Sequence, residues 1–319
     1  MDIKQKMKFL LLFLGGLCFS QNDSIVENAH IRTFDNKITT RLYFINTYNE
    51  FYFENDNGQQ LTFIPNSRDY LGASVGFRSI ELAYGFSPSF LSENKDNADS
   101  KLFNLNFRMF LGQWMQTLDY YRQKGFTVEL DALSNYSAGL ETYKVGGRTS
   151  YVFNKNFSFR AIGAQNEWQV KSAGSFVPRL AYYYTRYKLE EAGTSEDAST
   201  VNIALSPGYY YNWAITNNIL LSGGLTAGAG ISITEGLGDN DITTLLIEST
   251  ARLVLSYNSD TFFGGITSNA TIFGHNIDQD TYLSDELIYA EIYIGYRFNA
   301  PKSILKIADK VNRKLGLPH

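Results

Sequence analysis

Few residues in this chain have the types and spacing that catalysis or metal binding requires. The three histidines are His30, His275 and His319, and no two of them are spaced as metal ligands. No nucleophile-elbow pattern surrounds a serine, and neither His30 nor His275 lies where it would pair with a serine on a strand face. We therefore expect no metal ion, no cofactor and no enzymatic activity.

Acidic side chains gather in three short polar runs, at 96–99, 239–241 and 278–280, and none has the pattern of an EF-hand loop. Their carboxylates could hold calcium or the divalent ions that bridge lipopolysaccharide, but solvated loop charge is the simpler interpretation. The whole chain carries 28 basic and 32 acidic residues, so nucleic acid is not an expected partner.

A larger set of charged and polar residues falls on one face of the predicted strands, and these are the candidate functional residues. Both signs of charge occur, so the set suits either a self-paired network or a polar, aromatic-lined conduit or ligand cavity. It comprises Arg41, Glu81, Asn104, Asn106, Arg108, Asp119, Tyr121, Arg160, Arg179, Glu248, Arg252, Tyr289, Glu291, Tyr293 and Arg297.

Alternation of apolar and polar residues with a period of two positions these side chains. Within 101–111, one face carries Phe, Leu and Met, and the other carries Asn104, Asn106 and Arg108. Segment 286–298 repeats the pattern with isoleucines on one face, and weaker versions recur along the chain. This pattern predicts antiparallel strands, each with a dry and a wet face.

The lengths of the connections indicate which solvent these strands face. Short connections such as 78–79 and 112–113 alternate with long polar ones near 54–60, 87–100, 123–138, 189–199, 233–241 and 274–285. Such alternation is typical of tight periplasmic turns and longer outer loops. We predict an all-β, up-and-down transmembrane barrel in the bacterial outer membrane, with a soluble periplasmic sandwich as the alternative.

One segment departs from this scheme. Within 157–188 the apolar phase slips from odd to even positions, yet the chain must cross an odd number of times. Either Gln165–Ser175 folds inward, which gives about 12 strands, or it hides a short strand pair, which gives about 14. We favour the smaller number because Glu167–Lys171 is too short to cross. The candidate plug residues are Lys171, Ser172, Gly174 and Ser175.

The inward face of segment 219–232 is almost empty of side-chain volume, since it presents only Ser222, Gly224, Thr226, Gly228, Gly230 and Ser232. A barrel of about 12 strands is wider than the roughly 8 that side chains alone can fill. Water, a solute or a folded-in segment must occupy this space, and we expect a narrow or plugged lumen.

The two ends of the chain lie outside the predicted barrel of residues 38–298. Residues 1–20 combine early lysines with an apolar run, which is typical of a cleavable signal peptide and would remove the single cysteine, Cys18. We expect 21–37 to be a periplasmic segment. We expect 299–319 to be a basic amphipathic periplasmic tail with a short helix, because its apolar residues recur at helical spacing.

Several local patterns resemble a Bacteroidota outer-membrane β-barrel family known only as a domain of unknown function. The resemblance spans roughly residues 30 to 298. It is carried by His30-Ile31, Lys37 to Arg41, Ile64-Pro65-Asn66, Leu71-Gly72, Gly76, Trp114, Asp119, Tyr121, Lys124-Gly125-Phe126 and Lys171 to Ser175. It implies a barrel in the cell envelope and no particular activity.

Two functions fit these predictions. The first is a narrow or plugged channel, or a transport barrel for a small polar solute, with selectivity set by the charged lumen. The second is a structural or adhesive barrel that acts through its outer loops and basic tail, and a lipid-modifying enzyme is a remote alternative. Outer-membrane lipid and lipopolysaccharide are the expected surroundings, and the sequence leaves the oligomeric state open.

Overall fold

The computed structural model describes residues 29–55, 60–92, 99–130, 133–163, 166–191, 194–236, 241–276 and 281–315. The chain divides into two units, one of residues 28–299 and one that combines 1–27 with 300–319. The strands of the first unit are β1 (Ile31–Thr33), β2 (Lys37–Asn55), β3 (Gln60–Pro65), β4 (Asp69–Phe77), β5 (Ile80–Phe86), β6 (Lys101–Leu111), β7 (Trp114–Leu130), β8 (Leu133–Tyr151), β9 (Glu167–Gln169), β10 (Ala173–Phe176), β11 (Arg179–Glu191), β12 (Thr194–Ser206), β13 (Gly208–Ala214), β14 (Ile219–Glu235), β15 (Ile242–Asn258), β16 (Phe262–Asn276) and β17 (Thr281–Asn299). Two short 3-10 helices, η1 (Ser89–Leu91) and η2 (Arg160–Gly163), interrupt them.

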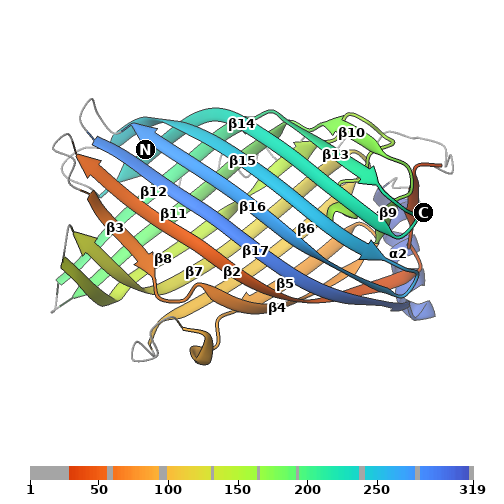
Figure 1. Ribbon diagram of the computed structural model, residues 1–319, viewed down its shortest axis with the longest axis horizontal. Coiled ribbons are helices and arrows are strands. Elements are labelled where there is room, and N and C mark those ends of the chain that lie inside the picture. Colours follow the sequence, from red (N-terminus) through yellow and green to blue (C-terminus); the bar gives the residue numbers. More distant parts are fainter. Residues whose placement is uncertain are drawn as a thin grey trace. The chain divides into compact units, whose positions relative to one another are not determined.

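Twelve strands of the described chain close into an antiparallel ring, which confirms the predicted barrel and the smaller strand number (Figure 1). Around the ring they follow the order β2, β4, β5, β6, β7, β8, β11, β12, β14, β15, β16 and β17, and β17 pairs with β2. Two wall strands are interrupted near prolines. Pro207 separates β12 from β13, both of which pair with β14, and Pro178 lies between β10 and β11.

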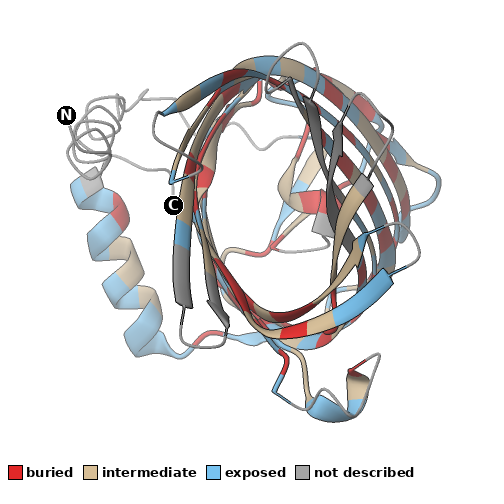
Figure 2. Cartoon of the chain, turned by 90° about the vertical axis from the view of Figure 1, so that its left-hand side faces the viewer, coloured by how far each residue is buried: buried red, intermediate tan, exposed pale blue. Residues whose placement is uncertain are grey.

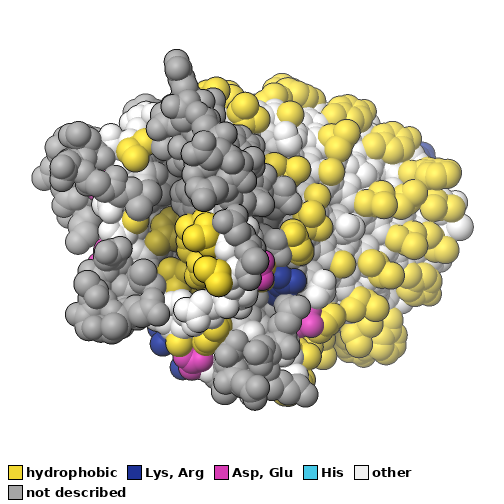
Figure 3. Space-filling model, turned by 60° about the vertical axis from the view of Figure 1, so that its left-hand side comes forward, with side chains coloured by type: hydrophobic (Ala, Val, Ile, Leu, Met, Phe, Trp, Pro, Cys, Tyr) yellow, Lys and Arg dark blue, Asp and Glu magenta, His cyan; other side chains and the backbone are white. Residues whose placement is uncertain are grey.

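The wall presents apolar side chains outward and polar ones inward. In β17, Ile292 and Ile294 point outward and are 55% and 67% exposed. Glu291, which precedes Ile292 and points inward, is 9% exposed. Hydrophobic side chains lie side by side over the part of the outer wall that is turned to the viewer in Figure 3. This arrangement is the reverse of a water-soluble sandwich, whose apolar face turns inward, and it fits a wall that contacts lipid. The soluble alternative is therefore wrong.

The strands continue further than the polarity of the sequence indicates. The segments 123–138 and 189–199, which we expect to be long loops, belong to hairpins whose strands stay paired as far as Leu130↔Leu133 and Glu191↔Thr194. The prediction was wrong because polar residues mark where a strand leaves the lipid, whereas the hydrogen-bond ladder continues in water. We call this the hairpin end, and the opposite end, with the tight turns at 78–79 and 112–113, the turn end.

The second unit is described only by helix α2 (Lys302–Leu315). Ile304, Ile307 and Val311 recur at helical spacing and are exposed, and Arg313 and Lys314 lie in the last turn. The predicted basic amphipathic helix is therefore present. None of the described helices is long and apolar enough to cross a membrane.

A glycine in β14 makes room for an aromatic ring inside the barrel. Tyr210 of β13 lies directly opposite Gly224, and a Cβ atom at Gly224 would fall 2.0 Å from the Tyr210 ring. Tyr210 is buried and stacks edge-on against Phe159, with ring centroids 4.9 Å apart. At this level, the small-residue face of β14 is therefore filled by Tyr210.

We predict that Gly224→Val destabilises the barrel by about 2 kcal/mol, because the added methyl groups displace the Tyr210 ring. Gly223→Val is the matched control, since a Cβ there meets no atom closer than 3.9 Å. Urea unfolding of the refolded protein in detergent measures both effects. Equal stability of the two variants would show that Tyr210 does not need this space.

Candidate functional site

Three stretches of the chain fold into the lumen at the turn end and fill it there. We define the plug as residues 31–34, 157–163 and 166–169, which contain β1, η2 and β9. β1 and β9 form a small antiparallel sheet of their own. Ala161 and Trp168 are buried against inward-facing wall residues such as Tyr43 and Tyr293. In the view along the barrel axis, chain segments lie inside the ring of strands (Figure 2).

Polar contacts fix the plug to the wall and to itself. The side chain of Gln169, which is 0% exposed, donates to the carbonyls of Asn156 and Lys171 at 2.7 and 2.8 Å. Its Oε1 accepts from the Asn212 amide of β13 at 3.1 Å. The Trp168 indole donates to the carbonyl of Asn217, in the turn between β13 and β14, at 3.0 Å. The plug therefore touches the tight turns directly.

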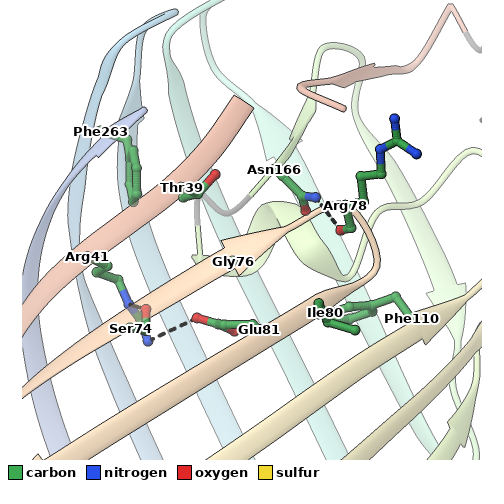
Figure 4. Close-up of a pocket in the computed structure, with 10 residues that line it drawn as sticks. All are labelled: Thr39, Arg41, Ser74, Gly76, Arg78, Ile80, Glu81, Phe110, Asn166 and Phe263. Atoms are coloured by element: carbon green, nitrogen blue, oxygen red, sulfur yellow. Dashed lines mark hydrogen bonds and ion pairs between the residues drawn. The ribbon is translucent and has the colours of Figure 1, made fainter. Parts of the chain in front are cut away.

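Further contacts join the plug to β17 and to the first turn. The Arg297 guanidinium lies between the rings of Phe34 and Phe263, 4.1 and 4.4 Å from their centroids. The Asn166 amide donates to the Arg78 carbonyl (Figure 4). A cavity of about 10 Å³ remains beside this contact, room for about one water molecule.

A larger cavity of about 120 Å³ lies next to the plug. Phe159, Ile162 and Val177 give it an apolar side, and threonine and tyrosine hydroxyls line the rest. Its charged lining residues are Arg41, Arg108, Arg148, Arg179, Arg252 and Glu291. Among the described residues, no group of three His, Cys, Asp or Glu side chains could hold a metal ion.

One side of the cavity is neutralised by ion pairs. Arg41 of β2 donates to Glu291 of β17 at 3.0 Å and lies 3.7 Å from Glu81 of β5. Arg108 of β6 donates to the other oxygen of Glu81 at 3.1 Å. Two guanidiniums and two carboxylates therefore balance one another across four strands, as buried charges require.

The opposite side contains a deeply buried carboxylate. Glu248 of β15 is 0% exposed, and it accepts hydrogen bonds from Arg179 and from the Ser206 hydroxyl, each at 2.7 Å. Asp119 of β7 accepts a hydrogen bond from the Tyr183 hydroxyl at 2.6 Å and another from Asn106.

The structure brings many of the sequence-predicted residues together at this cavity. Those that line it directly are Arg41, Asn106, Arg108, Arg179, Arg252, Tyr289 and Glu291. Asp119 and Glu248 lie behind the arginines, and Tyr293 packs beside Arg41. The Tyr121 hydroxyl donates a hydrogen bond to Gln123. Asn104 of β6 lies opposite Tyr121 in the pairing with β7.

Other predicted residues lie elsewhere. Arg160 belongs to the plug, where it pairs with Glu167 at 2.8 Å, and Arg297 contacts the plug at the turn end. Lys171 and Ser172 are exposed, whereas Gly174 and Ser175 belong to wall strand β10, which pairs with β13. The plug comes instead mainly from residues before position 170, because β10 completes the wall beside β13.

Sequence reasoning missed Arg148 and the plug strand β1. Arg148 shares its face of β8 with Lys144 and Ser150, but the glycines at 146 and 147 hide the alternation there. The pairing of β1 with β9 joins two three-residue strands that are far apart in the sequence. Segments this short have no measurable periodicity, so no sequence signal marks them.

The closed antiparallel ring, the apolar outer belt and the filled polar lumen define a transmembrane β-barrel of the bacterial outer membrane. The chain belongs to the family described as Domain of unknown function (DUF4421), which matches residues 21–298. No curated protein matches the chain.

Several solved structures are similar to this chain in outline. The outer membrane protease OmpT from Escherichia coli is 8% identical, with 87% of this chain and 100% of that chain covered and a TM-score of 0.39. The beta domain of the Bordetella autotransporter BrkA is 7% identical, with 83% and 100% covered and a TM-score of 0.43. The outer membrane protein OprG from Pseudomonas aeruginosa is 11% identical, with 84% and 98% covered and a TM-score of 0.28. Likenesses this low transfer no activity.

We predict that Arg179→Met destabilises the barrel by about 3 to 5 kcal/mol, because it leaves the Glu248 carboxylate buried without its cation. Adding Glu248→Gln should restore most of the loss. Arg186→Met is the control on the same strand, since Arg186 and Asp197 form an exposed pair. Urea unfolding measures all three, and equal losses for the two arginine variants would contradict the role of burial.

Proposed function

We propose that this protein is a narrow, plugged channel or transport barrel for a small polar solute. The observation that carries the proposal is the polar cavity of about 120 Å³ beside the plug. Protein interiors pack closely, and a lumen filled only for stability would close such a space with side chains. A cavity lined by guanidiniums and hydroxyls is instead suited to hold water or a polar solute.

The attachment of the plug supports a gated passage. The plug sheet has only the register pairs from Ile31↔Gln169 to Thr33↔Glu167, and hydrogen bonds join Trp168 and Gln169 to the wall. Water can replace such bonds, so displacement of the plug is a local opening that leaves the ring intact.

The lumen offers little to an enzymatic mechanism. The lumen carboxylates Glu81, Glu248 and Glu291 are engaged by arginines at 2.7 to 3.1 Å. Each of these carboxylates is therefore already occupied by a guanidinium of the protein, which is the arrangement of a structural ion pair. An origin in the Bacteroidota remains a prediction from the resembling segments.

We predict that the wild-type barrel conducts ions in small steps in planar bilayers. Replacing residues 159–168 with a short Gly-Ser linker should increase the single-channel conductance severalfold, because the ring loses its plug. Trp168→Ala, a milder change, should raise the frequency of opening.

Unfolding measurements on both variants verify that the ring still forms. Silence of the folded wild type and of both folded variants would contradict the channel. That outcome would favour the alternative in which the outer loops or the basic tail act on envelope partners.

A further inference from the structure

Three arginines meet on one side of the cavity with more donors than the surrounding wall uses. Arg148 comes from β8, Arg179 from β11 and Arg252 from β15, and all three line the same space. The cavity has a volume of about 120 Å³, so three like charges share a small space. Like charges held together in a poorly hydrated interior are costly unless an anion offsets them.

Arg252 contacts only neutral groups among the described residues. Its Nε donates to Asn269 at 3.3 Å, and its Nη2 donates to the Tyr289 hydroxyl at 3.1 Å. Because no carboxylate of the described chain pairs with it, its charge is available to a ligand.

Arg148 is also incompletely paired. Its nearest carboxylate oxygen in the described chain is Asp119 Oδ2 at 3.5 Å, and that oxygen already accepts the Tyr183 hydroxyl at 2.6 Å. The Nε atoms of Arg148 and Arg179 are buried and have no hydrogen-bond partner among the described residues. Arg179 donates through Nη2 alone, to Glu248, Thr226 and Thr250.

Counting the charged side chains on each side of the cavity shows where positive charge exceeds negative charge. Arg41 and Arg108 are matched by Glu81 and Glu291 on one side of the cavity. On the other side, Arg148 and Arg179 pair with Asp119 and Glu248, and Arg252 has no ion pair among the described residues. The positive excess therefore lies at Arg148, Arg179 and Arg252.

We propose that Arg148, Arg179 and Arg252 form a binding site for a small oxyanion, a carboxylate or a phosphate. A guanidinium presents paired N–H donors that match the oxygens of these groups. Tyr210, Thr267 and Tyr289 line the same cavity, and their hydroxyls are further hydrogen-bond donors for such a ligand. The volume of about 120 Å³ admits only a small ligand. This inference rests on the proposed function and names the class of its solute.

Isothermal titration of the full-length protein in detergent tests the site, with sodium phosphate and sodium succinate as probes. Succinamide, the neutral counterpart of succinate, is the control ligand. We expect saturable binding of at least one anion and none of succinamide. Binding of phosphate alone, of succinate alone or of both supports the oxyanion site and shows whether it accepts phosphates, carboxylates or both.

Arg252→Met should weaken that binding at least tenfold and leave the barrel folded, because no carboxylate in the described part of the chain would lose its ion pair. Arg252→Lys keeps the charge but loses the paired donors, so it should also weaken binding severalfold. Arg186→Met, outside the cavity, should bind as the wild type does. Absence of binding by both anions, or unchanged affinity in both Arg252 variants, would overturn the site.

Failure of this site and failure of the channel give different results. A protein that binds an anion in micelles but never conducts would remove the channel and keep the oxyanion site. A protein that conducts but binds neither anion would keep the channel and remove the site.

Discussion

Closure of the hydrogen-bond ladder is the constraint on which the rest of this structure depends. In lipid, every backbone N–H and C=O must be paired within the protein, so a sheet that crosses the membrane cannot keep an open edge. β14 meets this requirement by pairing with β15 on one side and with β12 and β13 on the other. Gly224 lets the buried Tyr210 ring lie inside that junction.

Closure also decides where charge can lie. Lipid-facing positions take isoleucines and leucines, and the polar half of each strand is therefore confined to the lumen. There Arg41, Glu81, Arg108 and Glu291 neutralise one another. A twelve-stranded ring is too wide for wall side chains alone to fill, and the plug occupies the turn end. The cavity that remains is lined by more guanidiniums than carboxylates. The architecture of the barrel therefore explains why we propose an anionic solute.

The wall could be predicted from the sequence because alternation is a local property. The residues assigned to the wet face at 289–297 lie on a strand whose burial alternates in that phase, and Asn106 and Arg108 line the internal cavity. The plug could not be predicted in the same way. Its sheet depends on contacts between 31–33 and 167–169, and the assignment of Gly174 and Ser175 depends on whether β10 joins the wall. Such long-range pairing leaves no period in the sequence, just as Gly146 and Gly147 obscure the phase of Arg148.

The accessibility of a thiol inside the plug tests the plugged lumen most directly. Ala161 is 0% exposed within the plug, whereas Lys171, ten positions further along the chain, is exposed. With Cys18 absent, Ala161→Cys in the folded barrel should react with a water-soluble maleimide at least about 100-fold more slowly than Lys171→Cys, because labelling requires local opening. Equal rates in a barrel that unfolding measurements show to be intact would contradict the account.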